Sequence, residues 1–141
     1  MYESYISDEE IIFVRHYGTF RGAESLAAIL STFESNPPKS QIKGAFFDLR
    51  DVTSADLSDT DRAYGSFFTD KLSSYGQSMN LDNIVSIYDP ENVELFATMS
   101  ERNKRLSGRF MDIDNMQRVY SLPEALKILG LPADYCIKYP D

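Results

Sequence analysis

Two β-prone runs open the chain. Residues 2–6 and 11–17 are rich in β-branched and aromatic side chains, and the polar segment 7–10 between them predicts a hairpin turn. Gly18 and Thr19 are expected to end the second strand, with the Thr19 hydroxyl capping the next helix. From 20 to 34, apolar residues recur at spacings of three and four, which predicts a helix with one buried stripe. The members of this stripe are Ala23, Leu26, Ala27, Leu30 and Phe33.

The middle of the chain continues this alternation after Asn36-Pro37-Pro38, which ends the first helix. Residues 44–48 form a short apolar run, typical of a strand buried on both faces. A helix is predicted over 59–75, with Ser58 as its N-cap, Asp61 in the capping-box position and Gly76 at its end. Residues 83–88 predict the next buried strand.

The last third of the chain predicts two more helices and one strand. Asp89-Pro90 predicts a helix start, because an N-cap acid precedes proline at the first helical position, and this helix runs to about Ser107. Residues 116–120 predict a strand, and Ser121 caps a last helix that ends at Gly130. Residues 109–115 are assigned to no element, and the tail after 130 is expected to pack on the surface.

The predicted order of elements is ββαβαβαβα. Strands separated by helices are joined by right-handed parallel crossovers, whereas the opening hairpin supplies an antiparallel member. The sequence therefore predicts an α/β fold, with one mixed sheet covered by four helices in a single domain spanning 1–141.

The charge balance narrows the range of partners. Fourteen Lys and Arg stand against 22 Asp and Glu, a net charge of −8, which argues against nucleic acid and anionic membranes as partners. The longest apolar stretch, residues 26–30, is far shorter than the roughly 20 residues that span a bilayer. The acidic N-terminus has no signal-peptide pattern. We therefore expect a cytoplasmic, bacterial protein, and its one cysteine, Cys136, excludes an internal disulfide.

Candidate catalytic groups are few. The single histidine, His16, could form a dyad with Cys136 if the fold brought them together, but a lone thiol outside any motif is more often a packing residue. The sequence has no nucleophile-elbow, phosphate-loop or dinucleotide-binding motif, and no zinc-type spacing of Cys and His. We therefore expect a non-enzymatic protein without a cofactor or a metal.

Carboxylates are densest between the third predicted strand and the second predicted helix, at Asp48, Asp51, Asp56, Asp59 and Asp61. Oxygen ligands at this position could hold Mg²⁺ or accept a phosphoryl group. The simpler interpretation is that these residues stabilise a turn and a helix start. Asp48, at the carboxyl end of a central predicted strand, resembles the phosphate acceptor of a receiver domain. That family also needs an acidic pair after its first strand and a lysine after its last strand, and here no lysine follows the last strand.

One basic cluster and one aromatic group complete the candidates. Arg102, Lys104, Arg105 and Arg109 lie near a predicted helix C-terminus, where cations are favourable without any ligand, although an acidic partner could also bind there. Four aromatic residues of the helix over 59–75 have the spacing of a buried face and could also line an apolar pocket. They are Tyr64, Phe67, Phe68 and Tyr75.

Residues 48–59, Asp-Leu-Arg-Asp-Val-Thr-Ser-Ala-Asp-Leu-Ser-Asp, resemble the STAS domain of bacterial anti-sigma-factor antagonists. In that family a strand ends in Asp-Leu, and Asp-Ser-Ser/Thr-Gly then opens a helix. The predicted ββαβαβαβα order is similar too, and residues 119–126 resemble the end of STAS-like proteins of unknown role, which are related in fold to lipid-binding CRAL-TRIO domains. The resemblance implies a signalling scaffold that acts by protein–protein contact.

The chain departs from the family at the phosphorylated position. In the antagonists, the serine directly after the motif's aspartate accepts phosphate from a partner kinase, whereas here Leu57 follows Asp56. Ser58 matches only the neighbouring hydroxyl, and Asp59 stands where the family has glycine. Leucine accepts no phosphate, and Asp59 would repel one nearby, so regulation by that kinase chemistry is not expected.

We therefore expect a STAS-like interaction module whose partner is another protein, or a second copy in a homodimer. The residues expected to make the contact are Asp51, Thr53, Ser54, Asp56, Ser58 and Asp59. The alternative is a protein that binds a small apolar molecule or an acyl lipid in a pocket beneath the helix over 59–75. A hydrolase or transferase dependent on His16 or Cys136 is a third hypothesis.

Overall fold

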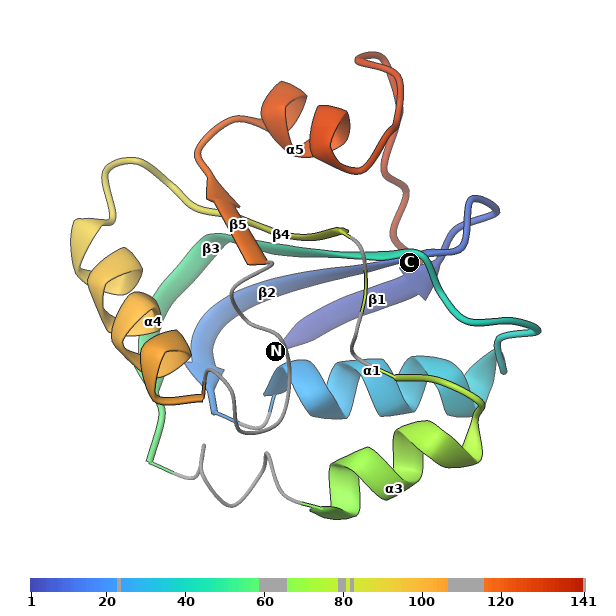
Figure 1. Ribbon diagram of the computed structural model, residues 1–141. Helices are drawn as coiled ribbons and strands as arrows, with labels where there is room; N and C mark the ends of the chain where they lie inside the picture. Colours follow the sequence, from blue (N-terminus) through green and yellow to red (C-terminus); the bar gives the residue numbers. More distant parts are fainter. Residues whose placement is uncertain (23, 59–65, 79–80, 82, 107–115, 141) are drawn as a thin grey trace.

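One mixed β-sheet forms the centre of the molecule (Figure 1). The computed structural model describes residues 1–140 except 23, 59–65, 79–80, 82 and 107–115, and omits the side chains of 66–69, 103, 105 and 106. Within these residues five strands lie in the order β1-β2-β3-β4-β5, with β1 antiparallel to β2 and all other pairs parallel. The α/β class and the mixed sheet are thus confirmed. The strands are β1 (Tyr2–Ile6), β2 (Ile11–Arg21), β3 (Gly44–Asp56), β4 (Asn83–Ile87) and β5 (Met116–Val119).

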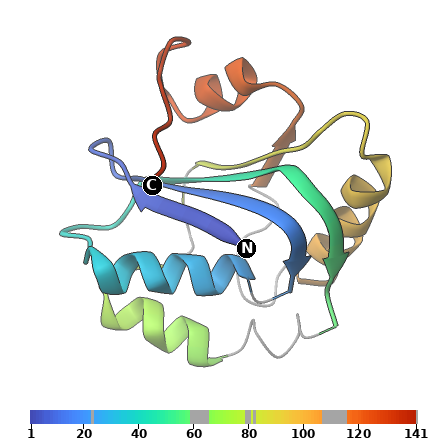
Figure 2. The same cartoon turned by 180° about the vertical axis from the view of Figure 1, so that it is seen from behind.

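Helices cover both faces of this sheet (Figures 1 and 2). The described helices are α1 (Glu24–Ser35), α3 (Ser66–Ser74), α4 (Val93–Leu106) and α5 (Leu122–Ile128). Helices α1 and α3 lie on one face, α5 and the C-terminal tail lie on the other, and α4 lies beside the far end of β3. No helix in the described part of the chain is long and apolar enough to cross a membrane.

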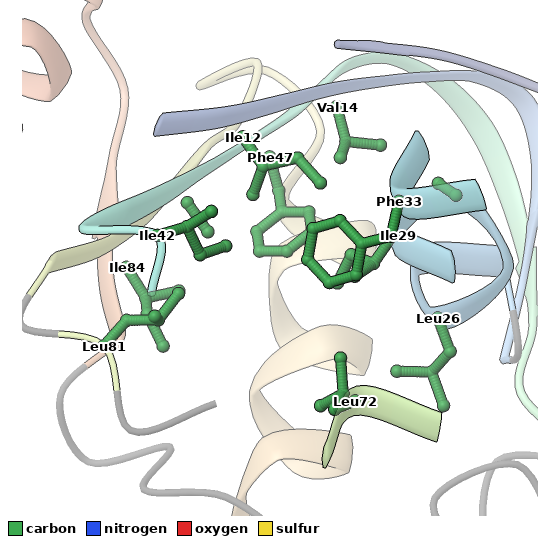
Figure 3. Packing of buried hydrophobic residues seen from close by; sticks show 12 residues of the cluster. Ile12, Val14, Leu26, Ile29, Phe33, Ile42, Phe47, Leu72, Leu81 and Ile84 are labelled. Atoms are coloured by element: carbon green, nitrogen blue, oxygen red, sulfur yellow. The ribbon is translucent and has the colours of Figure 1, made fainter. Parts of the chain in front are cut away.

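The face beneath α1 holds the largest hydrophobic cluster. Figure 3 shows Ile29 and Phe33 of α1 directed towards the strands, where Val14 and Phe47 meet them, and Leu26 on the side of Leu72. The predicted stripe of α1 is therefore partly wrong. Its members Leu26 and Phe33 are buried, but Ala27 is exposed, Leu30 is half-buried, and Ala28 and Ile29 are buried in their place. Position 23 lies outside the described residues.

The opposite face packs α5 and the C-terminal tail against aromatic strand residues. Phe13 and Phe46 are fully buried there. The Tyr135 ring stacks on Phe13 with centroids 5.9 Å apart, and Ile137 packs against the same cluster. The expectation that the tail packs on the body is confirmed.

Strands β2 and β3 both extend beyond their predicted ends, to Arg21 and Asp56. Gly18 does not end β2: it has a φ of 72°, and the strand continues past it. The Thr19 hydroxyl caps no helix: its Oγ1 lies 2.9 Å from Ser54 Oγ on β3. Helix α1 accordingly begins at Glu24 instead of residue 20.

The helix ends are set by local side-chain chemistry. Ser121 caps α5 as predicted, since its Oγ accepts from the Glu124 amide at 3.4 Å, and Gly130 follows that helix with a φ of 74°. Helix α4 starts later than predicted. Asn92, not Asp89, is its cap, and its Oδ1 accepts from the Leu95 amide at 3.2 Å.

Replacement of Gly44 by alanine tests the close approach of β3 to β4. A Cβ at this position would lie 3.1 Å from the carbonyl oxygen of Asn83 and 3.4 Å from Leu129 Cδ2. We expect Gly44→Ala to lower the free energy of unfolding by about 1–3 kcal/mol in urea denaturation, because backbone must move to relieve the contact. Val93→Ala, at an exposed position, should change it by less than about 0.5 kcal/mol. An unchanged Gly44→Ala stability would contradict this packing.

Candidate functional site

The outer half of β3, residues 49–56, has an open edge. Only Gly44–Asp48 pair with β4, whereas pairing with β2 continues to Asp56. Within the described residues, no strand therefore lies on the β4 side of this outer half. An unpaired strand edge presents N–H and C=O groups to whatever lies beside it.

Two β-bulges explain why β3 leaves β4. Between Arg15 and Tyr17, and again between Gly18 and Thr19, β3 contains one residue more than β2. An extra residue bends its strand and increases the local twist. The outer half of β3 accordingly turns towards α4 (Figure 1).

A groove of about 210 Å³ separates this open edge from the N-terminal half of α4. Leu95 and Met99 of α4 hold the helix in place, because they pack with Leu49 and Val52 of β3 in a buried cluster. The Asn92 side-chain Nδ2 donates to the carbonyl oxygen of Val52 at 3.2 Å. One main-chain acceptor of β3 therefore points to the open side. The groove is lined by Thr53, Ser54, Ala55, Asn92, Glu94, Leu95 and Thr98.

The residues predicted to make contacts lie on this strand and just beyond it. Thr53 and Ser54 are exposed and line the groove. Asp51 pairs with Arg15, whose Nη2 lies 2.7 Å from Asp51 Oδ2. Exposed Asp56 accepts from the amide of exposed Ser58 at 3.1 Å, and this hydrogen bonding lowers the pKa of Asp56. The sixth predicted residue, 59, lies outside the described residues.

The carboxylates of this region support the structural interpretation. Asp48 is buried, and its two oxygens accept from Arg50 Nε at 3.0 Å and Arg50 Nη2 at 2.8 Å. Asp51 and Asp56 have the partners given above, and Asp61 lies outside the described residues. No group of three or more metal-ligating residues occurs in the part of the chain that the structure describes.

A wide cleft of about 550 Å³ lies between β2, β3 and the C-terminal tail, on the α5 face. Its arginines, Arg15 and Arg50, are held by Asp51 and Asp48 respectively. Cys136 lies in this cleft and is exposed. Since the charged groups of the strands pair with one another, we assign no ligand to this cleft.

The dyad of His16 and Cys136 that was considered from the sequence does not form. Successive residues of a strand face opposite sides of the sheet. Arg15 lines the cleft that contains Cys136, whereas His16 is fully buried on the other face, with its ring 4.8 Å from that of Phe20. The contacts of His16 come from the start of α1 instead. Its Nε2 lies 3.2 Å from Ser25 Oγ, and its Nδ1 lies 3.4 Å from Glu24 Oε1.

His16 and Glu24 are both buried, and each affects the pKa of the other. Burial lowers the pKa of His16, and the cations at Met1 and Arg102 lower it further, while the contact with Glu24 opposes the shift. Burial raises the pKa of Glu24, but its contacts with His16 and the Met1 ammonium outweigh burial, so the net shift is downward. The Met1 nitrogen lies 2.7 Å from Glu24 Oε1. His16 is therefore neutral and Glu24 ionised near pH 7.

One small cavity is lined by residues that the structure describes. It measures about 20 Å³, room for one water molecule, and lies among α1, the strands and α4 instead of beneath α3. In this structure it has no space for an acyl chain. Of the predicted aromatic group, Tyr75 packs on Phe33 with ring centroids 5.6 Å apart. Tyr64 and the side chains of Phe67 and Phe68 lie outside the described residues.

The predicted basic cluster does not form a common surface in the described part of the chain. Lys104 is exposed, but Arg102 is buried, lines the small cavity and lies over the Phe20 ring at 5.6 Å. The side chain of Arg105 and all of Arg109 lie outside the described residues. The sequence analysis placed Arg102 near a helix C-terminus, and this did not predict that its side chain is buried.

Comparison with known proteins gives no assignment: no family model matches the chain, and no curated protein matches it.

Stability should fall as the pH falls from 7.5 to 5.5. The unfolded chain binds a proton at His16 near the ordinary pKa of about 6.5, whereas native His16 resists it because its pKa is lowered. The stability from His16 is therefore complete above 6.5 and is lost as the pH falls towards the native pKa, by at most about 1.4 kcal/mol per pH unit. Urea denaturation across this range measures the loss.

His16→Gln provides the control, since it removes the titrating ring. We expect its free energy of unfolding to vary less across the same range than that of the wild type. The carboxylates with lowered pKa, such as Glu9 and Asp56, start from ordinary values of 4.5 and 3.8 and act mainly below this range. Equal pH dependence in the two proteins would contradict the assignment to His16.

Proposed function

We propose that this chain is a STAS-like interaction module that binds an extended, basic segment of a partner protein along the outer half of β3. The observation that carries the proposal is the open edge of residues 49–56, which pair with β2 on one side and with no described strand on the other. Peptides that bind by strand addition use such an edge, where main-chain hydrogen bonds supply affinity. This binding requires no chemical step.

Charge around the groove selects the partner. Glu94 lines the groove and is exposed, whereas Asp51 and Asp56 on the same half of β3 already pair with Arg15 and Arg21. Together with the net charge of −8, Glu94 attracts a segment that carries lysine or arginine. In an extended segment, alternate side chains point to one side. Basic residues at every second position would therefore lie on the side that faces Glu94.

The resemblance to the STAS domain supports the same region. Residues 48–59 carry the degenerate motif of that family, and in this structure residues 48–56 belong to β3. Leu57 stands at the position of the phosphorylated serine. We therefore infer that binding at this edge is not switched by phosphorylation there.

A different protein is a better occupant of the edge than a second copy. Bulges and exposed charges protect strand edges from pairing with copies of themselves. Pairing two copies of this edge would also bring Glu94 and Asp56 of one chain near the same carboxylates of the other, which is unfavourable.

A short synthetic peptide of alternating lysine and valine tests the proposal. We expect it to shift the backbone amide resonances of Thr53, Ser54 and Ala55 in ¹H–¹⁵N spectra of the full chain. An acidic peptide of alternating glutamate and valine should leave these resonances unchanged. Basic-peptide shifts confined to other surfaces, or none, would overturn the proposal.

Charge reversal at the groove provides a matched pair of variants. Glu94→Lys should weaken binding of the basic peptide about fivefold or more, the equivalent of about 1 kcal/mol. Glu91→Lys changes the net charge equally at an exposed position that does not line the groove, and should have a smaller effect. Fluorescence polarisation with a labelled peptide measures both. Equal losses would mean that the net charge, and not this groove, binds the peptide.

A further inference from the structure

Strand β1 lies at the end of the sheet opposite β5, and its outer edge pairs with no strand in the described part of the chain (Figure 2). Its inner edge bonds β2, because the Tyr17 amide donates to the Met1 carbonyl oxygen at 3.0 Å and the Ser7 amide donates to the Ile11 carbonyl oxygen at 2.9 Å. In an antiparallel pair, only alternate residues bond the neighbouring strand. The residues of β1 whose main-chain groups point away from β2 are therefore Tyr2, Ser4 and Ile6.

This outer edge carries none of the usual features that prevent strands from pairing. Edge strands are commonly protected by lysine, by proline or by a bulge. The sequence of β1, Tyr-Glu-Ser-Tyr-Ile, has neither lysine nor proline, and its pairing with β2 has no shift of register. Its one charged residue, Glu3, already contacts Arg15 Nη1 at 3.5 Å. The edge of β1 thus differs from the bulged outer half of β3.

A second copy of β1 matches this edge when it runs antiparallel about Ser4. Ser4 then faces Ser4 of the second copy, and Tyr2 faces Ile6. Because the main-chain groups of these residues point outward, each facing pair can exchange two hydrogen bonds. Glu3 faces Tyr5, so no like charges lie opposite each other. The strand is therefore complementary to itself, as a two-fold interface requires.

Helix α1 leaves room for this approach. Ser4 faces α1, since its Oγ lies 2.5 Å from Thr32 Oγ1. A two-fold axis perpendicular to the sheet would place the α1 helices of both copies on the same face. Ser31 and Ser35 are one turn from Ala28 and Thr32 respectively, on the same side of α1, and both serines are exposed. Small, uncharged side chains there avoid crowding and like charges between the two helices.

We propose that this chain forms a two-fold symmetric homodimer in which the β1 strands of two copies pair antiparallel about Ser4 and join the two sheets. The interface is separate from peptide binding at the β3 edge, because β1 and β3 lie on opposite sides of β2. The net charge of −8 on each copy opposes association. The dimer should therefore dissociate on dilution.

Sedimentation velocity of the full chain tests the proposal at protein concentrations from about 5 to 500 µM. The average mass should rise from that of one chain towards that of two. Ser4→Pro removes an outward N–H group from each copy and leaves the bonds to β2 in place, since proline is tolerated where an edge N–H faces solvent. It should raise the dissociation constant of the dimer about tenfold or more.

Ser4→Ala is the matched control. It loses the same hydroxyl contact with Thr32 but keeps the N–H group, so it should dimerise like the wild type. Circular dichroism confirms that both variants are folded. A wild type that stays monomeric over the whole range would overturn the proposal, and so would equal dissociation constants for folded Ser4→Pro and Ser4→Ala.

Hydrogen exchange of the wild type tests the register without any variant. The amides of Ser4 and Ile6 should exchange more slowly at the high concentration than at the low one, because they are bonded only in the dimer. The amides of Glu3 and Tyr5 bond β2 in either state and should exchange at the same rate at both concentrations. Dimerisation without slower exchange at Ser4 and Ile6 would place the interface elsewhere and overturn the proposal.

Discussion

Pairing of β2 with both of its neighbours holds the two strand edges on which the proposals depend. On one side β2 pairs with β1, and on the other it stays with β3 to Arg21 and Asp56, although β4 has already ended opposite Asp48. One side of the ribbon of β2 and β3 carries His16 to the start of α1, and the other edge faces α4 across a groove. If the ribbon were shorter, His16 would lose its neighbours and the groove would lose one wall.

Packing around the ribbon explains how its open edge persists. Leu49 and Val52 direct their side chains into a cluster with Leu95 and Met99 of α4, so the ribbon is anchored by side chains where it lacks a neighbouring strand. The Asn92 amide satisfies one main-chain carbonyl of β3 as a neighbouring strand would. Burial of apolar surface thus holds the edge in place while leaving part of it for a partner.

The sequence predicted what local chemistry determines. The opening hairpin, the parallel order of later strands, the Ser121 cap and the glycine after α5 each depend on a few neighbouring residues, and all agree with the structure. The outer half of β3 was not predicted as a strand, because the apolar run of the predicted strand ends at Asp48. Its strand conformation comes from pairing with β2, which is distant in the sequence. The buried face of α1 was predicted only in part: Leu26 and Phe33 are buried, but Ala28 and Ile29 are buried in place of Ala27 and Leu30.

The residues of the candidate sites were likewise predicted where neighbouring residues determine their contacts and missed where the fold brings distant residues together. Asp56 acts in a turn with Ser58, as a sequence pattern can indicate. Glu24 and Ser25 were missed because no motif connects them to His16, and only the return of the chain from β2 into α1 brings them together. A polar Glu-Ser pair at the start of an otherwise apolar helix, close in sequence to the single histidine, was the one available signal.

Hydrogen exchange at the backbone amides of residues 51–56 measures the state of the ribbon most directly. The structure predicts two classes of amide: slow exchange where the N–H group points to β2, and fast exchange where it points to the open edge. Uniformly fast exchange across these residues would mean a mobile loop, and would contradict the open strand edge on which this account rests.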